Sequence, residues 1–285
     1  MAASIRPHPE VLLSGLALGE SPRWHDGRLW FSDWLAHEIV ALDPQGRREV
    51  ILHVDAMPFS IDWLPDGRLL IVSNADGRRL LRREPDGAVV THADLGGLVD
   101  RPWNEIVVDG RGNAYVNSIC FDLMGGEEPA PGIIAVVAPD GTVRQLADGL
   151  AFPNGMAVTP DNSTLIVAES YAKRLTAYDI AADGGLSHRR VWADVDGYPD
   201  GICLDADGAV WCAAMSRCVR VAEGGQVLAS VELDRSCFAC ALGGPDDRTL
   251  FVMAAEWTGP EGMTSRRRTG QVVAVAAPAR GAGWP

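Results

Sequence analysis

Long apolar runs are missing from this sequence. No segment approaches the roughly 18 consecutive apolar residues that a membrane-spanning helix needs. The N-terminal stretch lacks the charged segment, apolar core and cleavage site of a secretion signal. We therefore expect a cytoplasmic protein with no membrane partner.

Positive charge is also scarce. Asp and Glu number 38 against 25 Lys and Arg, so the formal net charge is −13. Nucleic acids and anionic membrane surfaces attract basic proteins, and an acidic chain is a poor match for both. We expect a small-molecule partner, no nucleic acid, and a chain that is a monomer or a weak homo-oligomer.

Several familiar catalytic motifs do not occur. The sequence has no G-x-S-x-G nucleophile elbow and no H-E-x-x-H zinc motif, and its six histidines are scattered. Cys237 and Cys240 form a C-x-x-C pair, but no second pair or nearby histidine completes a zinc site. With no sign of secretion, the six cysteines are expected to be reduced thiols.

Turn residues are abundant, whereas the 3.6-residue periodicity of amphipathic helices is absent. The chain has 31 Gly and 18 Pro, and short apolar runs alternate with polar turns. Residues 198–211, YPDGICLDADGAVW, predict a tight hairpin around Asp207 and Gly208. This pattern indicates an all-β protein.

The hairpin pattern occurs six times. The starts of the units are 40, 44, 50, 46 and 40 residues apart. Four-stranded units of about this length are typical of propeller blades, because a single blade cannot bury both of its faces. The units begin at Glu20, Ser60, Asn104, Asn154, Asp200 and near Cys240.

The repeats predict one domain over residues 1–285: a six-bladed β-propeller with four-stranded antiparallel blades around a central channel. A long β-solenoid is the alternative, although its coils are usually shorter and more regular. We expect residues 10–18 to complete the last blade, and residues 1–9 and 279–285 to be flexible ends. Two long loops, residues 119–131 and 254–270, are expected to form a lid or wall at one mouth.

The first residues of the units predict a polar ring. In a propeller, the first strand of every blade lines the channel and all six run the same way, so these residues converge at one mouth. Glu20 and Asp200 would repel each other there, and burying them unpaired would be costly. A divalent cation removes that cost, and oxygen ligands suit calcium, magnesium or manganese.

Four segments resemble the SMP-30/gluconolactonase/luciferin-regenerating-enzyme family. They are GESPRW with Glu20, FPNGMAVTPD with Asn154, YPDGICLDADG with Asp200, and CFACALGGPDDRTLFV near residue 240. The resemblance covers roughly residues 15–277. It implies a six-bladed propeller with one catalytic divalent cation on its axis and hydrolysis of lactones, most often sugar lactones.

Carried over residue by residue, the resemblance implies that Glu20, Asn154 and Asp200 bind the metal. Calcium is the expected ion, with magnesium, manganese and zinc as alternatives. Asp200 is the expected general base, although an unperturbed Asp, with a pKa of about 3.9, is a weak base, so water activation would depend mainly on the cation.

Asn104 and Arg101 correspond to the family's substrate-binding residues. The family often reads R-x-N-D, whereas this chain reads Arg101-Pro-Trp-Asn-Glu105, which is one residue longer and ends in Glu. Trp103 is expected to supply an apolar wall, which would suit a substrate less polar than a sugar lactone.

The expected activity is therefore that of a gluconolactonase-like hydrolase acting on the ester bond of a sugar or related small lactone. Two alternatives remain open. One is a metal-dependent esterase or phosphotriesterase with the same fold. The other is a non-enzymatic propeller whose metal is structural.

Overall fold

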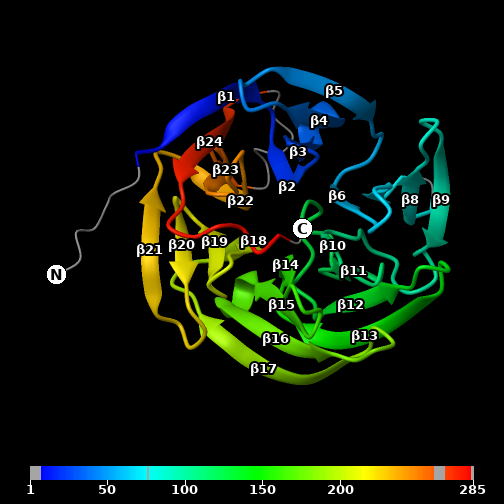
Figure 1. Cartoon of the computed structure of the whole chain (residues 1–285). Coiled ribbons are helices and arrows are strands. Elements are labelled where there is room, and N and C mark those ends of the chain that lie inside the picture. Colours follow the sequence, from blue (N-terminus) through cyan, green and yellow to red (C-terminus); the bar gives the residue numbers. More distant parts are fainter. Residues whose placement is uncertain (1–7, 76, 260–266, 284–285) are drawn as a thin grey trace.

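Six four-stranded antiparallel sheets surround a central axis in the computed structural model, which describes residues 8–75, 77–259 and 267–283 (Figure 1). Two short 3-10 turns, η1 (Trp34–Ala36) and η2 (Ser170–Ala172), interrupt the strands, and the described residues contain no α-helix. None of the described segments forms a helix long and apolar enough to cross a membrane. The predicted all-β, six-bladed β-propeller is confirmed.

The first three blades follow one another in chain order. Blade 1 contains β2 (Gly19–His25), β3 (Arg28–Asp33), β4 (Glu38–Leu42) and β5 (Arg48–His53). Blade 2 contains β6 (Phe59–Trp63), β7 (Leu69–Ser73), β8 (Arg79–Arg83) and β9 (Val89–Asp94). Blade 3 contains β10 (Ile106–Val108), β11 (Ala114–Ser118), β12 (Gly132–Val137) and β13 (Val143–Leu150).

The remaining blades include one that combines both ends of the chain. Blade 4 contains β14 (Pro153–Val158), β15 (Thr164–Glu169), β16 (Arg174–Ile180) and β17 (Leu186–Asp194). Blade 5 contains β18 (Pro199–Leu204), β19 (Val210–Ala214), β20 (Arg217–Val221) and β21 (Val227–Glu232). Blade 6 contains β22 (Ser236–Gly243), β23 (Thr249–Ala255), β24 (Gly270–Ala276) and β1 (Glu10–Leu16).

Strand β1 closes the ring. It pairs with β24 in antiparallel register, and Figure 1 shows the blue β1 beside the red β24. The carboxylate of Asp33 accepts hydrogen bonds from the N–H groups of Ala17 (3.2 Å) and Leu18 (2.9 Å), where the chain passes from β1 into β2. The N-terminal strand therefore completes the last blade, as the sequence predicts.

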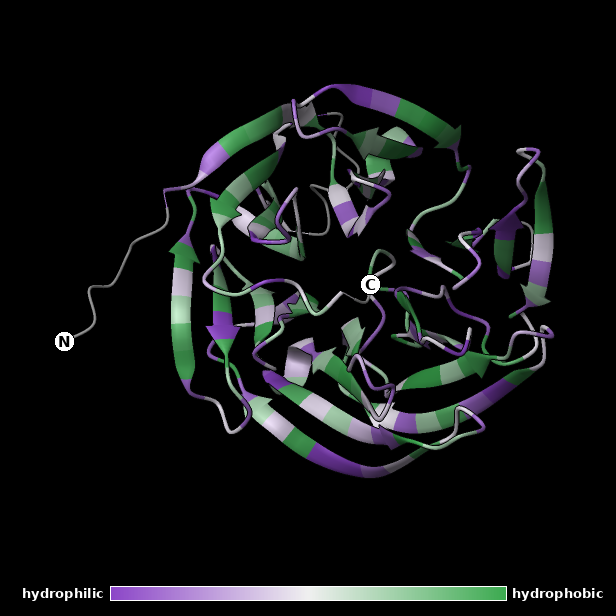
Figure 2. Ribbon diagram, in the orientation of Figure 1, coloured by the Kyte–Doolittle hydropathy of each residue, from purple (hydrophilic) through white to green (hydrophobic). Residues whose placement is uncertain are grey.

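Burial separates the middle strands from the outermost ones. Strands β11, β12 and β19 are buried along their whole length, whereas most residues of β17 and β21 are exposed or half-buried. In Figure 2 the outermost strands mix hydrophilic and hydrophobic positions. A strand with a blade on each face needs apolar side chains on both, while an outer strand can alternate. This difference makes the fourth strand of each blade harder to recognise from apolar patterning than the inner strands.

The turn at residues 205–209 illustrates how the repeated Asp-Gly pairs build hairpins. The Asp205 carboxylate accepts the N–H groups of Asp207 and Ala209, both at 3.0 Å, while Gly208 donates to the Asp205 carbonyl at 3.0 Å. Gly208 has φ +80°, a left-handed conformation that is cheap for glycine. The predicted hairpin between β18 and β19 is present.

A C-terminal segment lies along blade 5. The N–H of Ala206 donates to the Arg280 carbonyl (2.8 Å), and the N–H of Ala282 donates to the Leu204 carbonyl (3.0 Å). A pocket of about 340 Å³ beside it is lined by Thr159, Leu204 and Ala282, among others. This pocket lies at the ends of β14 and β18 opposite to Asn154 and Asp200, so it is separate from the predicted polar ring.

Candidate metal centre

Glu20, Asn154 and Asp200 occupy the same place in three different blades. Each is the second residue of the first strand of its blade, on β2, β14 and β18 respectively. Their interactions show that they lie together, because the negative charge of Asp200 acts on Glu20 and the Asn154 side chain hydrogen-bonds the Asp200 carboxylate. The three predicted metal ligands therefore converge at one mouth of the channel.

Burial and charge both act against ionisation of the two carboxyl groups. Burial, followed by the charges of Asp200 and Glu105, raises the pKa of Glu20 well above its usual 4.5. Burial and the charge of Glu105 likewise raise the pKa of Asp200 well above 3.8, against the opposing hydrogen bond from Asn154. In the described part of the chain, neither carboxylate forms an ion pair with Lys, Arg or His. A divalent cation stabilises such a pair of carboxylates.

Two glycines allow this close approach. A Cβ atom on Gly155 would lie 2.6 Å from the Asp200 carbonyl oxygen, and one on Gly201 would lie 2.5 Å from the Ala239 Cβ. Any side chain at either position would push the first strands of blades 4, 5 and 6 apart. The Gly that follows Asn154 and the Gly that follows Asp200 therefore set the spacing of the centre.

Side chains from second strands and adjoining turns hold Asn154 in place. The Ser170 hydroxyl donates to the Pro199 carbonyl (2.6 Å) and accepts from the Asn154 Nδ2 (3.4 Å). The Asn117 Nδ2 donates to the Asn154 carbonyl (2.7 Å). Sequence reasoning missed Ser170 and Asn117 because neither begins a repeat unit.

Asn104 lies beside the strand that carries Asn154. Its Nδ2 donates to the Pro153 carbonyl (3.4 Å), and its backbone N–H donates to the Asn117 carbonyl (2.7 Å). Arg101, by contrast, is paired with Glu127 of the 119–131 loop, at 2.5 Å between Nη2 and Oε1 and 3.0 Å between Nε and Oε2. The structure thus joins Asn104 to the centre and joins Arg101 to a loop carboxylate.

The expectation that Trp103 supplies an apolar wall is wrong. Its side chain is completely buried in the cluster between blades 2 and 3, and its Nε1 donates to the Leu95 carbonyl at 3.3 Å. Successive side chains of extended backbone point to opposite sides, so the neighbour of a channel residue enters the core. Trp103 therefore stabilises the contact between the two blades.

The sixth ring position also differs from the prediction. The first strand of blade 6 begins at Ser236, not near Cys240, and its pairing with β23 is bulged between Cys237 and Ala239. At the corresponding position of blade 2, the Ser60 hydroxyl is buried without a hydrogen-bond partner among the described residues. The looser turn of the sixth repeat hid the true start of β22.

A second acidic group, not predicted from the sequence, surrounds Arg23. Burial raises the pKa of Glu105 to about 7 and that of Asp62 to about 6, while the charge of Arg23 opposes both shifts. Arg23 Nη2 lies 3.9 Å from Glu105 Oε2, and Arg23 Nε lies 3.7 Å from Asp62 Oδ1. The charge of Glu105 also acts on Glu20 and Asp200, so this group lies close to the candidate metal centre.

The donor set suits a hard cation. Two carboxylates and an amide offer only oxygen ligands, which calcium and magnesium prefer. Within the described ranges, no three His, Cys, Asp or Glu side chains are arranged to hold a metal. The candidate set has only two such residues, Glu20 and Asp200, because its third member is an asparagine.

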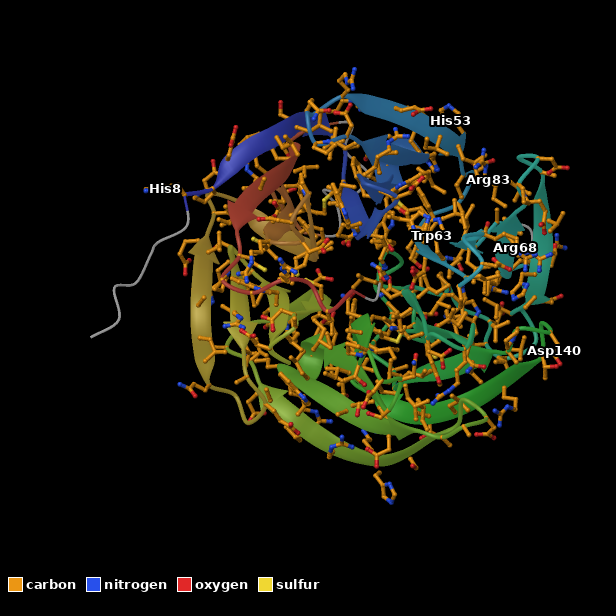
Figure 3. The ribbon with its side chains drawn as sticks, in the orientation of Figure 1. His8, His53, Trp63, Arg68, Arg83 and Asp140 are labelled. Atoms are coloured by element: carbon orange, nitrogen blue, oxygen red, sulfur yellow. The ribbon has the colours of Figure 1, made fainter. Side chains whose placement is uncertain are left out.

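Histidine and cysteine offer no competing site of this kind in the described ranges. His8 and His53 lie exposed at the outer edge, as Figure 3 shows, and all six cysteines are free thiols.

The chain is thus a six-bladed propeller that presents carboxylate and amide oxygens at one mouth of its channel. This chain belongs to the SMP-30/gluconolactonase/LRE-like family, whose sequence model matches residues 18–256. The resemblance drawn from the segments around Glu20, Asn154 and Asp200 is thereby confirmed.

Relatives within this family carry different names. Pentonolactonase XacC of Haloferax volcanii is 28% identical over 266 residues, covering 86% of this chain and 84% of its own. The solved structure of a luciferin-regenerating enzyme has a TM-score of 0.82 at 21% identity, covering 96% of this chain and 97% of its own. Regucalcin of Agrobacterium tumefaciens, described as a calcium-binding protein, has a TM-score of 0.76 at 25% identity and covers 96% of both chains.

Proposed function

We propose that this protein is a metal-dependent lactone hydrolase that opens a small lactone with water. The observation that carries the proposal is the convergence of Glu20, Asn154 and Asp200, two of them buried or half-buried carboxylates without a cationic partner among the described residues. The name of the pentonolactonase relative supports the reaction class. The proposal places the enzyme among hydrolases of carboxylic ester bonds.

Glu20, Asn154 and Asp200 would hold one divalent cation. Calcium is our first choice, because the Agrobacterium regucalcin is a calcium-binding protein. Magnesium, manganese and zinc are the alternatives. The two carboxylates balance a charge of +2, and the asparagine adds a neutral ligand. When bound, such a cation supplies charge stabilisation for a developing oxyanion and a water of lowered pKa.

Asp200 is the proposed general base. Its carboxylate accepts a proton from the water that attacks the lactone carbonyl carbon, and then donates that proton to the ring oxygen as the C–O bond breaks, which leaves the open hydroxy acid. The hydrogen bond from the Asn154 side chain orients the Asp200 carboxylate. Asn104, fixed by the Pro153 and Asn117 carbonyls, would orient the substrate. Arg101 would reach the substrate when it leaves Glu127.

The test is hydrolysis of a panel of sugar and aliphatic lactones by metal-stripped protein. Calcium, magnesium, manganese or zinc is then restored, and Asp200→Ala is assayed in parallel. Metal-dependent turnover that the variant loses would support the proposal. Turnover of aryl esters or phosphotriesters alone would favour the esterase or phosphotriesterase alternative. A protein that binds the metal but cleaves none of these compounds would have a structural metal instead.

A further inference from the structure

Three aromatic side chains gather where blades 3 and 4 meet at the mouth of the channel. Phe152 precedes Asn154 by two residues, and its ring centroid lies 4.6 Å from that of Tyr171 and 5.7 Å from that of Phe121. Phe121 is buried beneath, whereas Tyr171 is 44% exposed. The buried side of the cluster thus packs against Phe121 of the 119–131 loop, and its Tyr171 side faces solvent.

Backbone hydrogen bonds attach this cluster to the metal centre. The N–H of Ser170 donates to the Phe152 carbonyl (3.0 Å), and the N–H of Tyr171 donates to the Ala151 carbonyl (3.1 Å). The side chain of Ser170 is also the one that hydrogen-bonds Asn154. The rings of Phe152 and Tyr171 therefore stand on the same short segments as the predicted ligands.

Exposed apolar side chains continue around the mouth into blade 5. Tyr198 precedes Asp200 by two residues, is 49% exposed, and has the Lys173 Nζ 5.1 Å above its ring. Burial and the nearby Tyr198 raise the pKa of Tyr171, so the two phenols lie close to each other. Met215 is exposed beside Gly197, the residue before Tyr198.

The same surface extends into blade 6. The N–H of Cys237 donates to the Met215 carbonyl (2.6 Å), and the next residue, Phe238, lies 5.8 Å from the exposed Trp257, measured between ring centroids. We name these side chains the apolar rim: Phe152, Tyr171, Tyr198, Met215, Phe238 and Trp257.

Two members of the rim have unfavourable backbone conformations. Phe152 has φ +61° and Met215 has φ +58°, in the left-handed region that glycine tolerates best. A bulky residue there costs on the order of 1 kcal/mol, and such strain concentrates at functional sites. At both positions the chain therefore presents a large apolar side chain where glycine would fit more easily.

The geometry points to a subsite for an apolar substituent. We propose that the apolar rim binds an aryl or medium-length alkyl group attached to the lactone ring, so that the preferred substrate is an aryl- or alkyl-substituted lactone and not a polyhydroxylated sugar lactone. Exposed apolar patches beside a polar centre are typical of ligand sites. The inference depends on the proposed lactonase activity, and it assigns that activity a substrate class.

The experiment compares four five-membered lactones with the metal-loaded protein. They are unsubstituted γ-butyrolactone, γ-phenyl-γ-butyrolactone, γ-nonalactone and D-xylono-1,4-lactone. We expect the phenyl and alkyl lactones to have kcat/KM values at least about tenfold above those of the other two, within the range that apolar pockets provide. Phe152→Ala and Tyr171→Ala should each lower the phenyl-to-unsubstituted selectivity by about tenfold.

Two variants serve as controls. Tyr171→Phe should keep the selectivity, because the ring and not the hydroxyl makes the contact. Val191→Ala removes an exposed apolar side chain from the outer strand β17, away from the rim, and should change nothing. A preference for the xylonolactone, or a parallel loss on all four lactones in the rim variants, would overturn the inference.

A binding measurement separates this inference from the proposed function. The lactam 5-phenyl-2-pyrrolidinone has the shape of the phenyl lactone but resists hydrolysis, and its affinity is measured by calorimetry. Binding that Phe152→Ala weakens at least about fivefold would support the rim even if no lactone is cleaved. No binding of the lactam would refute the subsite. Rim variants that change the oligomeric state without altering lactam affinity would also refute it and would make the rim a protein interface.

Discussion

Arg101 and Glu127 form a two-point ion pair that ties the segment before β10 to the loop between β11 and β12. Glu127 Oε2 also accepts the N–H of Asp122 at 2.8 Å, which folds the loop back on itself. The side chains are 35% and 44% exposed, so water screens the pair and it can open readily. The pair therefore holds the Arg101 guanidinium on this loop.

Glu127→Gln should make Arg101 available. The amide keeps an acceptor for the Asp122 N–H but removes the charge that holds the guanidinium. We expect KM for the best lactone substrate to fall by up to about fivefold with little change in kcat, because the released pair is a weak surface one. Glu128→Gln, the same change one residue further along the exposed loop, is the control. An unchanged KM in both Glu127→Gln and Arg101→Ala would show that Arg101 does not contact substrate.

Asp200→Asn should impair both metal binding and turnover. The variant loses one of two negative charges at the centre and the proposed proton acceptor. We expect kcat/KM to fall by about 100-fold or more, since even partners of metal ligands typically account for about 10- to 100-fold. Calorimetric titration with calcium should show weaker binding. Asp196→Asn removes an exposed carboxylate four residues earlier, and a comparable loss there would contradict a specific role for Asp200.

Asp62 should make stability depend on pH. Burial raises its folded pKa to about 6 from its usual 3.8, so folding favours the protonated form. This contribution is fully present below pH 3.8 and is lost as the pH rises through about 6. Relative to Asp62→Asn, the wild-type free energy of unfolding should therefore fall by up to about 3 kcal/mol across that interval.

Urea unfolding measures the difference in free energy of unfolding between the wild type and Asp62→Asn. The pH values are chosen on both sides of the usual pKa of 3.8 and the folded pKa of about 6. Asp66→Asn is the control, because Asp66 is an exposed partner of Arg68 and its pKa is lowered. A difference that grows with pH would mean that Asp62 ionises more easily in the folded protein than in the unfolded chain.

Most thiols should be unreactive in the folded protein. All six cysteines are free, five of them are buried, and Cys120 is half-buried. Burial raises the pKa of Cys203, Cys212 and Cys218, which keeps them in the poorly nucleophilic thiol form. Burial acts the same way on Cys240, but hydrogen bonds with Cys203 and Cys218 outweigh it and lower the pKa of Cys240 to about 5, so only its inaccessibility protects this thiol. A disulfide-exchange reagent should label one thiol slowly in native protein and all six in denaturant. Cys120→Ser should abolish the native reaction, and several native thiols reacting together would refute this assignment.

The blade repeat was predictable because local chemistry repeats. Each Asp-Gly turn, such as that around Asp205 and Gly208, encodes its own hairpin through carboxylate acceptors and a left-handed glycine. The sixth repeat is irregular, so these local signals predicted the start of β22 near Cys240, whereas the strand begins at Ser236.

The candidate centre was predictable only in part. Glu20, Asn104, Asn154 and Asp200 each begin a repeat unit, which predicts a polar ring. The resemblance to the family then implied that Glu20, Asn154 and Asp200 are the metal ligands. Ser170 and Asn117 support Asn154 from other strands, and no repeat position distinguishes them. The prediction for Trp103 was wrong because successive side chains of an extended segment point to opposite sides. Asn104 faces the channel, so its neighbour Trp103 packs in the core.

The sequence by itself determined the all-β class, the number of blades, and, to within one residue, where the channel strands of blades 1, 2, 4 and 5 begin. These properties depend on turn chemistry and apolar patterning, which act over a few residues. Only the tertiary structure decided that burial and the charge of Asp200 raise the pKa of Glu20, that Glu105 acts on both carboxyl groups, and that Arg101 is held by Glu127. Such effects depend on distance and burial, and Glu20 and Asp200, 180 residues apart in the chain, become neighbours only when β1 closes the ring.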